Sequence, residues 1–475
     1  MNKEYKGDWY LPKSKEKIPG TLIVNSSIKK ITLELFTNTY LTEEPIIYNK
    51  IETTNQRQFE LILGDTQQKT TLHNCVFRSA SSIGKHLHKI TYEVEFVFLN
   101  IHLTKVSDLR IHKVEVKYPY LSTFFDGWES TKDFDDKIES NIKSKPISIT
   151  EKLELILVDK YYKKTTKLGE GFEMKYSKSI IFQYSSGETF NEVIRNLYKF
   201  SKLLSFTTKE NAYFNLNSII IPLEQVESYN KYCLINEGLC QTSIINFSHH
   251  RHSDVNKTSL HQNFMLFSRW TFEEKELNHL IKMWFNNTQL TPIYDFYIDS
   301  NNWFKRKSII LSNVMFNNKF LNLIQGLESY YDIKDPDFIK DNDTFTKNRQ
   351  KLTNEITDNE LKNWALKNIK FPKTPSLTDK LEYFITKFNE IIKQIKGIDS
   401  FIQNYSIEAT RYRHELSHGR IEMTYQGQEF HKIYSFSKVL LCFCILESLN
   451  ITNDRIKRIC SSNFHLNREF EQITL

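Results

Sequence analysis

The stretch DSFIQNYSIEATRYRHELSHG, residues 399–419, decides the fold class of the C-terminal part of the chain. Its apolar residues recur at helical spacing and it ends at a glycine, which is typical of an amphipathic helix. The same pattern recurs in four further segments: 314–332, 352–369, 376–397 and 430–451. The last is apolar on most sides, so we expect it to be buried. Short connections and amphipathic stripes predict an α-helical bundle over residues 308–475.

Residues 1–305 follow a different pattern. The run YEVEFVF, within 89–103, alternates with period two as a half-buried strand does. We expect further strands at 20–24, 31–36, 57–63, 109–118, 151–162 and 175–185, and helices at 190–206 and 273–287. The charged segment 129–146 reads as a linker or long loop, with a subdivision near 129–148. The predicted fold class is α+β multidomain: a β-rich, sandwich-like N-terminal half with a few helices, then an all-α bundle.

Composition sets the broad class. The chain has 475 residues and a formal net charge of +7, which permits a polyanionic partner such as RNA without requiring one. Its six cysteines form no C-x-x-C pair and no disulfide-framework spacing. The N-terminal residues lack the apolar core of a signal peptide, and no apolar segment approaches the roughly 20 residues that span a bilayer. We therefore expect a cytoplasmic protein without a membrane segment.

The letters HELSH match the H-E-x-x-H pattern of zinc peptidases. In that interpretation His414 and His418 bind zinc and Glu415 is the general base. Gly419 follows directly and tends to stop the helix, and no third histidine lies at the metzincin spacing. The remaining candidate for a third ligand is Glu447, in a segment that looks like bundle core. A zinc peptidase is therefore the less favoured alternative.

The overlapping letters RHELSH place Arg413 five positions before His418. RNA can be cut without a metal when its own 2′-OH attacks the adjacent phosphorus. Histidine suits the proton transfers because its pKa lies near neutrality, and arginine suits the phosphate because its charged fork donates two hydrogen bonds. No carboxylate cage or cysteine cluster for a catalytic metal is evident, so we expect neither a cofactor nor a metal.

The spacing poses a geometric problem. Five residues on a straight helix turn through about 500°, which leaves the side chains of Arg413 and His418 about 140° apart. They converge only if the helix breaks near residues 417–419, or if a second subunit completes the site. A two-fold dimer brings two copies of the motif into one cleft, so we expect a homodimer through the bundle.

Two other segments invite a binding interpretation. FSHHRHSD, residues 247–254, contains three histidines beside an aspartate and is a possible metal site, although a solvated loop is the favoured reading. Trp9 and Tyr10 offer a stacking platform for a base or sugar, but aromatic packing in the first strand is favoured over it.

The motif also carries a family resemblance. RHELSHG resembles the R-x(4–6)-H signature of the HEPN superfamily, and FLNLIQGLESYY (320–331) resembles the first helix of an ApeA-like HEPN domain. The opening GDWYLPKSKEKIPGTLIVNSSIKKITLEL (7–35) is similar to the start of the ApeA N-terminal domain. The two matches bracket nearly the whole chain, and their order is that of ApeA-like proteins.

The resemblance implies a bacterial anti-phage factor whose HEPN domain is a metal-independent endoribonuclease acting by abortive infection. It implies that Arg413 and His418 are the catalytic pair and that His414 is the polar helper, which either orients the phosphate or shares the proton transfer. Glu328, in the first bundle helix, is expected to face the site. The N-terminal half is expected to hold the enzyme quiet and to sense a phage-derived trigger. Some HEPN domains have lost catalysis, so a non-catalytic interaction module remains an alternative.

Overall fold

A computed structural model describes most of the chain. The described residues are 2–10, 16–28, 30–38, 58–83, 87–103, 105–106, 109–125, 139–165, 172–229, 234–236, 239–246, 261–301, 309–334, 342–369, 375–395, 397–418 and 427–474. The expected boundary at 305–308 and the histidine-rich segment 247–254 lie outside them.

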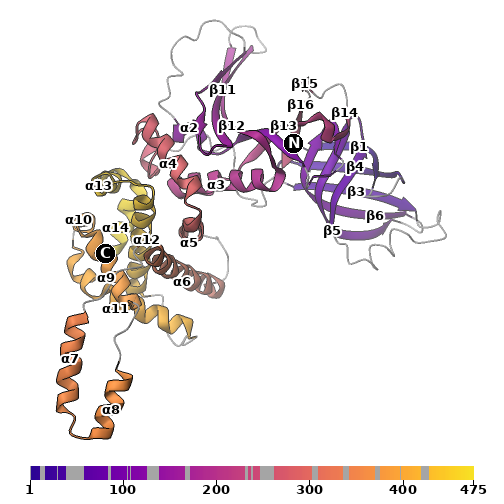
Figure 1. Cartoon of the computed structure of the whole chain (residues 1–475). Helices are drawn as coiled ribbons and strands as arrows, with labels where there is room; N and C mark the ends of the chain where they lie inside the picture. The colour runs from indigo at the N-terminus through magenta and orange to yellow at the C-terminus, as the bar shows by residue number, and fades with distance from the viewer. Residues whose placement is uncertain are drawn as a thin grey trace. The chain divides into compact units, whose positions relative to one another are not determined.

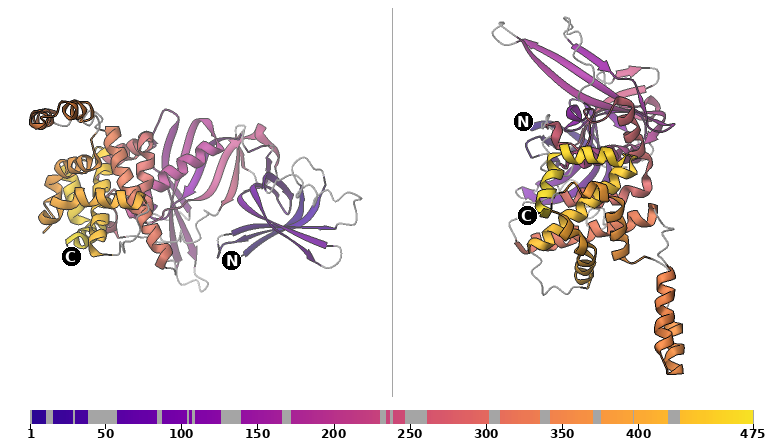
Figure 2. Two further views of the ribbon diagram at one scale, coloured as in Figure 1. Left: turned by 90° about the horizontal axis from the view of Figure 1, so that it is seen from below. Right: turned by 90° about the vertical axis from the view of Figure 1, so that its left-hand side faces the viewer.

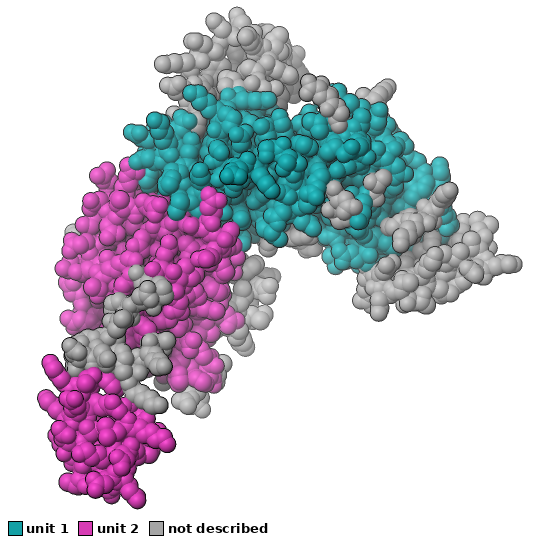
Figure 3. All heavy atoms as spheres, in the orientation of Figure 1, with its two compact units in different colours: residues 1–262, 267–285 teal, residues 263–266, 286–475 magenta. Residues whose placement is uncertain are grey.

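The chain divides into two compact units, coloured separately in Figure 3. Unit 1 comprises residues 1–262 and 267–285, and unit 2 comprises residues 263–266 and 286–475. Unit 1 is built mainly from strands and unit 2 from helices, as labelled in Figure 1. The β-rich N-terminal half and the helical C-terminal half are therefore confirmed.

Unit 1 contains a large antiparallel sheet. Its strands and those of a small accessory sheet are β1 (Asn2–Tyr10), β2 (Ile18–Asn25), β3 (Lys30–Asn38), β4 (Gln58–Asp65), β5 (Lys69–Ile83), β6 (Leu87–Leu99), β7 (Ile101–Leu103), β8 (Arg110–Lys117), β9 (Glu139–Lys143), β10 (Ile147–Ser148), β11 (Leu153–Thr165), β12 (Phe172–Thr189), β13 (Asn215–Pro222), β14 (Val226–Tyr229), β15 (Leu234–Asn236) and β16 (Leu239–Asn246). Its helices are α2 (Leu121–Phe125), α3 (Phe190–Thr208) and α4 (Glu274–Asn286).

The first six strands close on themselves. β1 pairs with β2 and β4, β2 with β3, β3 with β6, β6 with β5, and β5 with β4. These pairings return to the starting strand and form a ring, which lies near the N-terminus in the left view of Figure 2. The sandwich-like half thus takes the form of one continuous sheet, part of which is closed. Closure is favourable because it leaves no unpaired strand edge in the ring.

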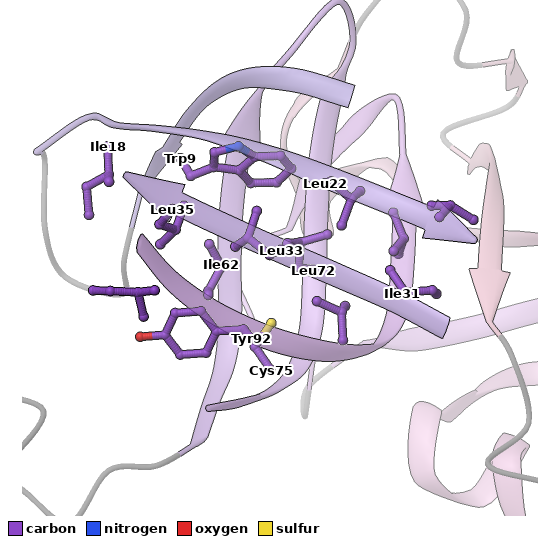
Figure 4. Close-up of a cluster of buried hydrophobic side chains, with 14 residues drawn as sticks. Trp9, Ile18, Leu22, Ile31, Leu33, Leu35, Ile62, Leu72, Cys75 and Tyr92 are labelled. Atoms are coloured by element: carbon purple, nitrogen blue, oxygen red, sulfur yellow. The ribbon is translucent and has the colours of Figure 1, made fainter. Parts of the chain in front are cut away.

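Trp9 fills the interior of this ring. Its side chain is fully buried among apolar neighbours that include Leu33, Ile62 and Leu72 (Figure 4). The favoured reading of Trp9 as a packed aromatic is therefore confirmed. The indole lies so close to the backbone that a Cβ atom built at Gly64 would overlap its ring atoms.

The remaining strands extend the sheet in the order β10-β11-β12-β8-β13-β16. β16 is shared with the ring: its residues 239–243 pair with β13, and its residues 244–246 pair with β6. Helix α3 packs on this part, with the Phe200 ring 6.0 Å from that of Phe182 and the Tyr118 hydroxyl donating to the Leu197 carbonyl at 2.9 Å. Burial of these aromatic side chains anchors the helix to the sheet.

Unit 2 is a bundle. Its helices are α5 (Thr291–Asn301), α6 (Ile309–Lys334), α7 (Asn342–Glu355), α8 (Asn359–Asn368), α9 (Leu377–Lys387), α10 (Asn389–Ile392), α11 (Asp399–Ser417), α12 (Gln428–Ser448), α13 (Asn453–Ser462) and α14 (Phe464–Thr474). Helix α12 is buried along most of its length, as its sequence predicted. Its interior polar residues are paired: Ser437 Oγ lies 2.8 Å from the Tyr405 hydroxyl, and Lys438 Nζ lies 2.5 Å from Glu469 Oε1.

Several element boundaries differ from those predicted. Residues 139–143, placed in the linker, form β9 because they pair with β11. The single helix expected at 352–369 is two helices, because Asp358 caps α8 by accepting hydrogen bonds from the backbone of Glu360 and Leu361. The Ser376 cap of α9 is confirmed and forms a capping box with Asp379.

The cysteines also differ from expectation at one position. Cys240 is disulfide-bonded, although the cysteine spacing indicated no disulfide pattern. Cys75, Cys442, Cys444 and Cys460 are buried free thiols, and burial raises the pKa of Cys75 and Cys444. No helix in the described part of the chain is long and apolar enough to span a bilayer.

We predict that Gly64→Ala destabilises unit 1 by about 1–3 kcal/mol, because the new methyl group and the Trp9 indole compete for one volume. Hydrogen exchange of the β1 and β4 amides measures the change in local opening. Gly427→Ala is the control, because a Cβ atom at Gly427 meets nothing within 4 Å and the residue has a φ of −67°. Unchanged protection of both strands in Gly64→Ala contradicts this packing.

Candidate active site

Helix α11 is held in the bundle by one side. Its buried residues are Tyr405, Ser406, Ala409 and Tyr412, spaced so that they share a face. Besides the contact of Tyr405 with Ser437, the Tyr412 ring lies 5.1 Å from that of Phe430 on α12. Burial of Tyr412 raises the pKa of its hydroxyl. The residues that follow Tyr412 on α11 therefore lie at the margin of the bundle.

Arg413 is partly exposed and faces α6. Its terminal nitrogen Nη2 lies 3.6 Å from Glu328 Oε2, and the two side chains keep 42% and 26% of their surface exposed. The expectation that Glu328 faces the motif is confirmed. The separation is that of an ion pair rather than a hydrogen bond, so the guanidinium is attracted to α6 by charge without donating a hydrogen bond to Glu328.

His414 and His418 form an exposed pair at the C-terminal end of α11. Their ring centroids are 4.4 Å apart. The His418 backbone amide donates to the His414 carbonyl at 3.1 Å, and the Ser417 hydroxyl donates to the Arg413 carbonyl at 2.8 Å. The helix is therefore continuous through Ser417, and His418 is its C-terminal cap.

Arg413 and His418 are not joined by any contact among the described residues. The helix ends where the sequence predicted, but the His418 ring lies against His414, while Arg413 pairs with Glu328. Gly419 lies outside the described residues. Within the described part of this chain, the end of α11 does not bring the two side chains into contact.

Arg411, two positions before Arg413, interacts with residues of its own helix. Arg411 forms an ion pair with Glu408, and its guanidinium lies 5.0 Å from the centre of the Tyr412 ring. Burial opposes its charge, but the attraction of Glu408 outweighs it and raises the pKa of Arg411. Arg411 and Arg413 therefore have different counter-ions, one local and one on α6.

Glu447, the candidate third zinc ligand of the peptidase alternative, already has two side-chain partners. Glu447 accepts a hydrogen bond from the Tyr330 hydroxyl at 2.9 Å and pairs with Lys387 Nζ at 3.0 Å. Burial lowers the pKa of Lys387, but its partners Tyr383 and Glu447 outweigh this and raise it. Among the described residues, no group of three or more His, Cys, Asp or Glu side chains is arranged to hold a metal ion. Glu447 instead connects α12 with α6 and α9.

This connection was not found from the sequence. Tyr330, Lys387 and Glu447 come from three helices, and no motif or spacing links them. The sequence suggests Glu447 only as a candidate zinc ligand, because the H-E-x-x-H pattern requires a third ligand downstream. One general signal was available: a carboxylate on a buried helix requires a partner that compensates its charge.

Two family models match the chain. A family model described as ApeA N-terminal domain 1 matches residues 4–275, and one described as Apea-like HEPN matches residues 321–455. The chain belongs to the ApeA-like family. Arg413, His414, His418 and Glu328 all lie in the matched HEPN region of this ApeA-like protein. No curated protein and no solved structure matches the chain.

The family gives a coarse function. HEPN domains are typically RNases, commonly bind RNA and commonly dimerise. A HEPN domain that follows an ApeA N-terminal domain supports a nuclease-type role in anti-phage defence.

We predict that Glu447→Ala destabilises unit 2 by about 1–2 kcal/mol, because it leaves Lys387 and the Tyr330 hydroxyl without their shared carboxylate. Thermal unfolding with hydrogen exchange of α9 and α12 measures the loss. Glu390→Ala is the comparison, because Glu390 is 73% exposed and lies 3.9 Å from its partner Lys457. Equal effects of the two substitutions contradict the connecting role of Glu447.

Proposed function

We propose that this ApeA-like protein is a metal-independent endoribonuclease of anti-phage defence that acts by abortive infection. The observation that carries the proposal is the exposed His414–His418 pair, one position from a cationic Arg413 in a HEPN domain. Two imidazoles and a guanidinium are the groups that metal-free cleavage of RNA requires.

The proposed reaction is an internal transesterification. His418 takes the proton from the ribose 2′-OH, the 2′-oxygen forms a bond to phosphorus, and the bond from phosphorus to the 5′-oxygen breaks. A protonated imidazole returns a proton to that leaving oxygen. His414, whose ring lies beside His418, serves as this acid or orients the phosphate. Arg413 stabilises the charge that develops on the phosphorane oxygens. The products carry 2′,3′-cyclic phosphate and 5′-OH ends.

We propose that the active form is a homodimer through the HEPN domain. Arg413 of one chain turns to Glu328 of α6, while His418 turns to His414, so one chain offers the two groups in different directions. A two-fold axis beside the end of α11 can place Arg413 of each chain opposite His418 of the other. The exposure of both histidines is consistent with a face that a second copy or RNA covers.

The N-terminal region is proposed to regulate the nuclease in the cytoplasm, where its RNA substrate is found. The ApeA N-terminal domain match covers residues 4–275, which contain no part of the R-x4-H motif. A domain that accompanies the nuclease without contributing its motif is suited to hold it inactive until a phage-derived trigger binds.

We expect the trigger-activated protein to cleave bulk bacterial RNA in EDTA. His418→Ala and Arg413→Ala are expected to lose about a hundredfold or more, because each removes a group that acts in the transition state. Arg411→Ala is the matched control and is expected to stay within about threefold, since its charge is paired with Glu408. End-group analysis should find 2′,3′-cyclic phosphates.

The alternatives give other results in the same assay. A zinc peptidase requires metal and fails in Glu415→Gln, whereas the proposed RNase keeps its activity in that variant. A binding module shows no cleavage of RNA by the trigger-activated protein and no toxicity that depends on His418. Cleavage that survives in His418→Ala is incompatible with the proposed mechanism.

We predict that Glu328→Gln tightens RNA binding by about twofold to tenfold at low salt, because it removes the anion 3.6 Å from Arg413. Fluorescence anisotropy with labelled RNA, in a His418→Ala background that does not cleave, measures the affinity. Asp332→Asn is the matched control: it removes the same charge one turn along α6, where the carboxylate pairs with Lys380 at 2.6 Å. Equal changes in both variants indicate general charge and contradict a specific role for Glu328.

A further inference from the structure

Helices α7 and α8 form an antiparallel hairpin, drawn as a pair in Figure 1. The side chain of Arg349 on α7 donates to the Leu366 carbonyl near the end of α8. Among the hairpin residues whose side chains the structure describes, Thr353 and Ala365 are the buried ones. The hairpin therefore has almost no core of its own.

One side of α8 carries a distinctive stripe. Glu360, Leu361, Trp364, Lys367 and Asn368 are spaced by three, four and seven residues and so share one side of the helix, and all five are exposed. Trp364 is 60% exposed and Leu361 is 52% exposed. We call these five residues the α8 stripe. Trp364 lies at its centre, with the acid one turn before it and the base about one turn after it.

This stripe needs a cover. α7 has 14 residues and α8 has 10, and helices of this length are marginal in water unless an apolar face is packed. Their packing against each other buries two small side chains and leaves the largest apolar one in solvent. An exposed Trp with an adjacent Leu on such an element marks an interaction surface.

The charges of the stripe identify the partner. In an antiparallel pairing of α8 with a copy of itself about Trp364, Glu360 of each chain lies opposite Lys367 of the other, and the apolar residues meet at the axis. A two-fold contact requires this self-complementarity. We propose that the α8 stripe binds the α8 stripe of a second copy of this chain. The inference rests on the homodimer of the proposed function, but not on RNA cleavage.

RNA fits the stripe less well. A strand that stacks on Trp364 requires positive charge along its path, and the stripe has no net formal charge because Glu360 balances Lys367.

The contact between two α8 stripes is small, because a ten-residue helix is too short for a standard interface of about 800 Å² per partner. The contact alone therefore predicts a reversible dimer whose population depends on protein concentration.

The test is sedimentation equilibrium of the full-length protein without RNA, over a concentration series. The wild type is expected to pass reversibly from monomer to dimer. Trp364→Ala is expected to raise the dissociation constant about tenfold or more, because it removes the central apolar contact. Circular dichroism of each variant verifies that its helices form. A wild type that stays monomeric throughout overturns the proposal.

Charge reversal makes the test specific. Glu360→Lys and Lys367→Glu alone each place like charges opposite one another and are expected to weaken the dimer about tenfold. Mixing the two variant proteins restores both attractive pairs and is expected to restore association as a heterodimer. Lys351→Glu is the control, since this exposed lysine lies on α7 outside the stripe, and the dissociation constant is expected to stay unchanged.

The double variant excludes a trivial explanation. Glu360→Lys combined with Lys367→Glu opposes the helix dipole at both ends of α8, so it harms the helix more than either single change. Recovery of the dimer in the double variant can therefore arise only from pairing between chains. Failure of both the mixture and the double variant to associate overturns the proposal, as does loss of RNA binding with unchanged mass in Trp364→Ala. RNA cleavage is measured in a separate assay, so a failed nuclease assay does not change the conclusion about dimerisation.

Discussion

The burial of α12 is the constraint on which the helical unit depends. The helix is apolar on most sides, so its stability depends on the helices that cover those sides. α11 is positioned through Tyr405 and Tyr412, α14 through Glu469, and α6 and α9 through Glu447. The few polar groups on α12 therefore select which neighbour lies where, while its apolar surface supplies the stabilisation.

The candidate site lies at the margin that this packing creates. Tyr412 is the last residue of α11 with a buried side chain, and the R-x4-H residues follow it immediately. Among the described residues, their side chains are held by one ion pair and one ring contact, and not by a network of hydrogen bonds. For the proposed reaction, such groups have to be ordered by a further partner. Both proposed partners, RNA and a second chain, are suited to do so.

The sequence predicted the helices with strong periodicity, the Ser376 cap and the packed role of Trp9. It missed β5, where Thr70 and Thr71 are buried and interrupt the apolar alternation, and β9, which forms only because β11 is beside it. Within the site, the family resemblance led to the expectation that Glu328 faces the motif, and its ion pair with Arg413 agrees with it. The orientation of His418 toward His414 was not predictable, because it depends on where α11 ends and on which neighbour a free ring contacts.

The shared strand β16 has a consequence for the mechanics of unit 1. Its first residues hydrogen-bond to β13 of the open sheet and its last residues to β6 of the closed ring. Neither part can separate from the other without breaking a ladder of backbone hydrogen bonds along a single strand. We therefore expect the ring and the open sheet to unfold together, and a distortion introduced in either to be transmitted through covalently continuous backbone.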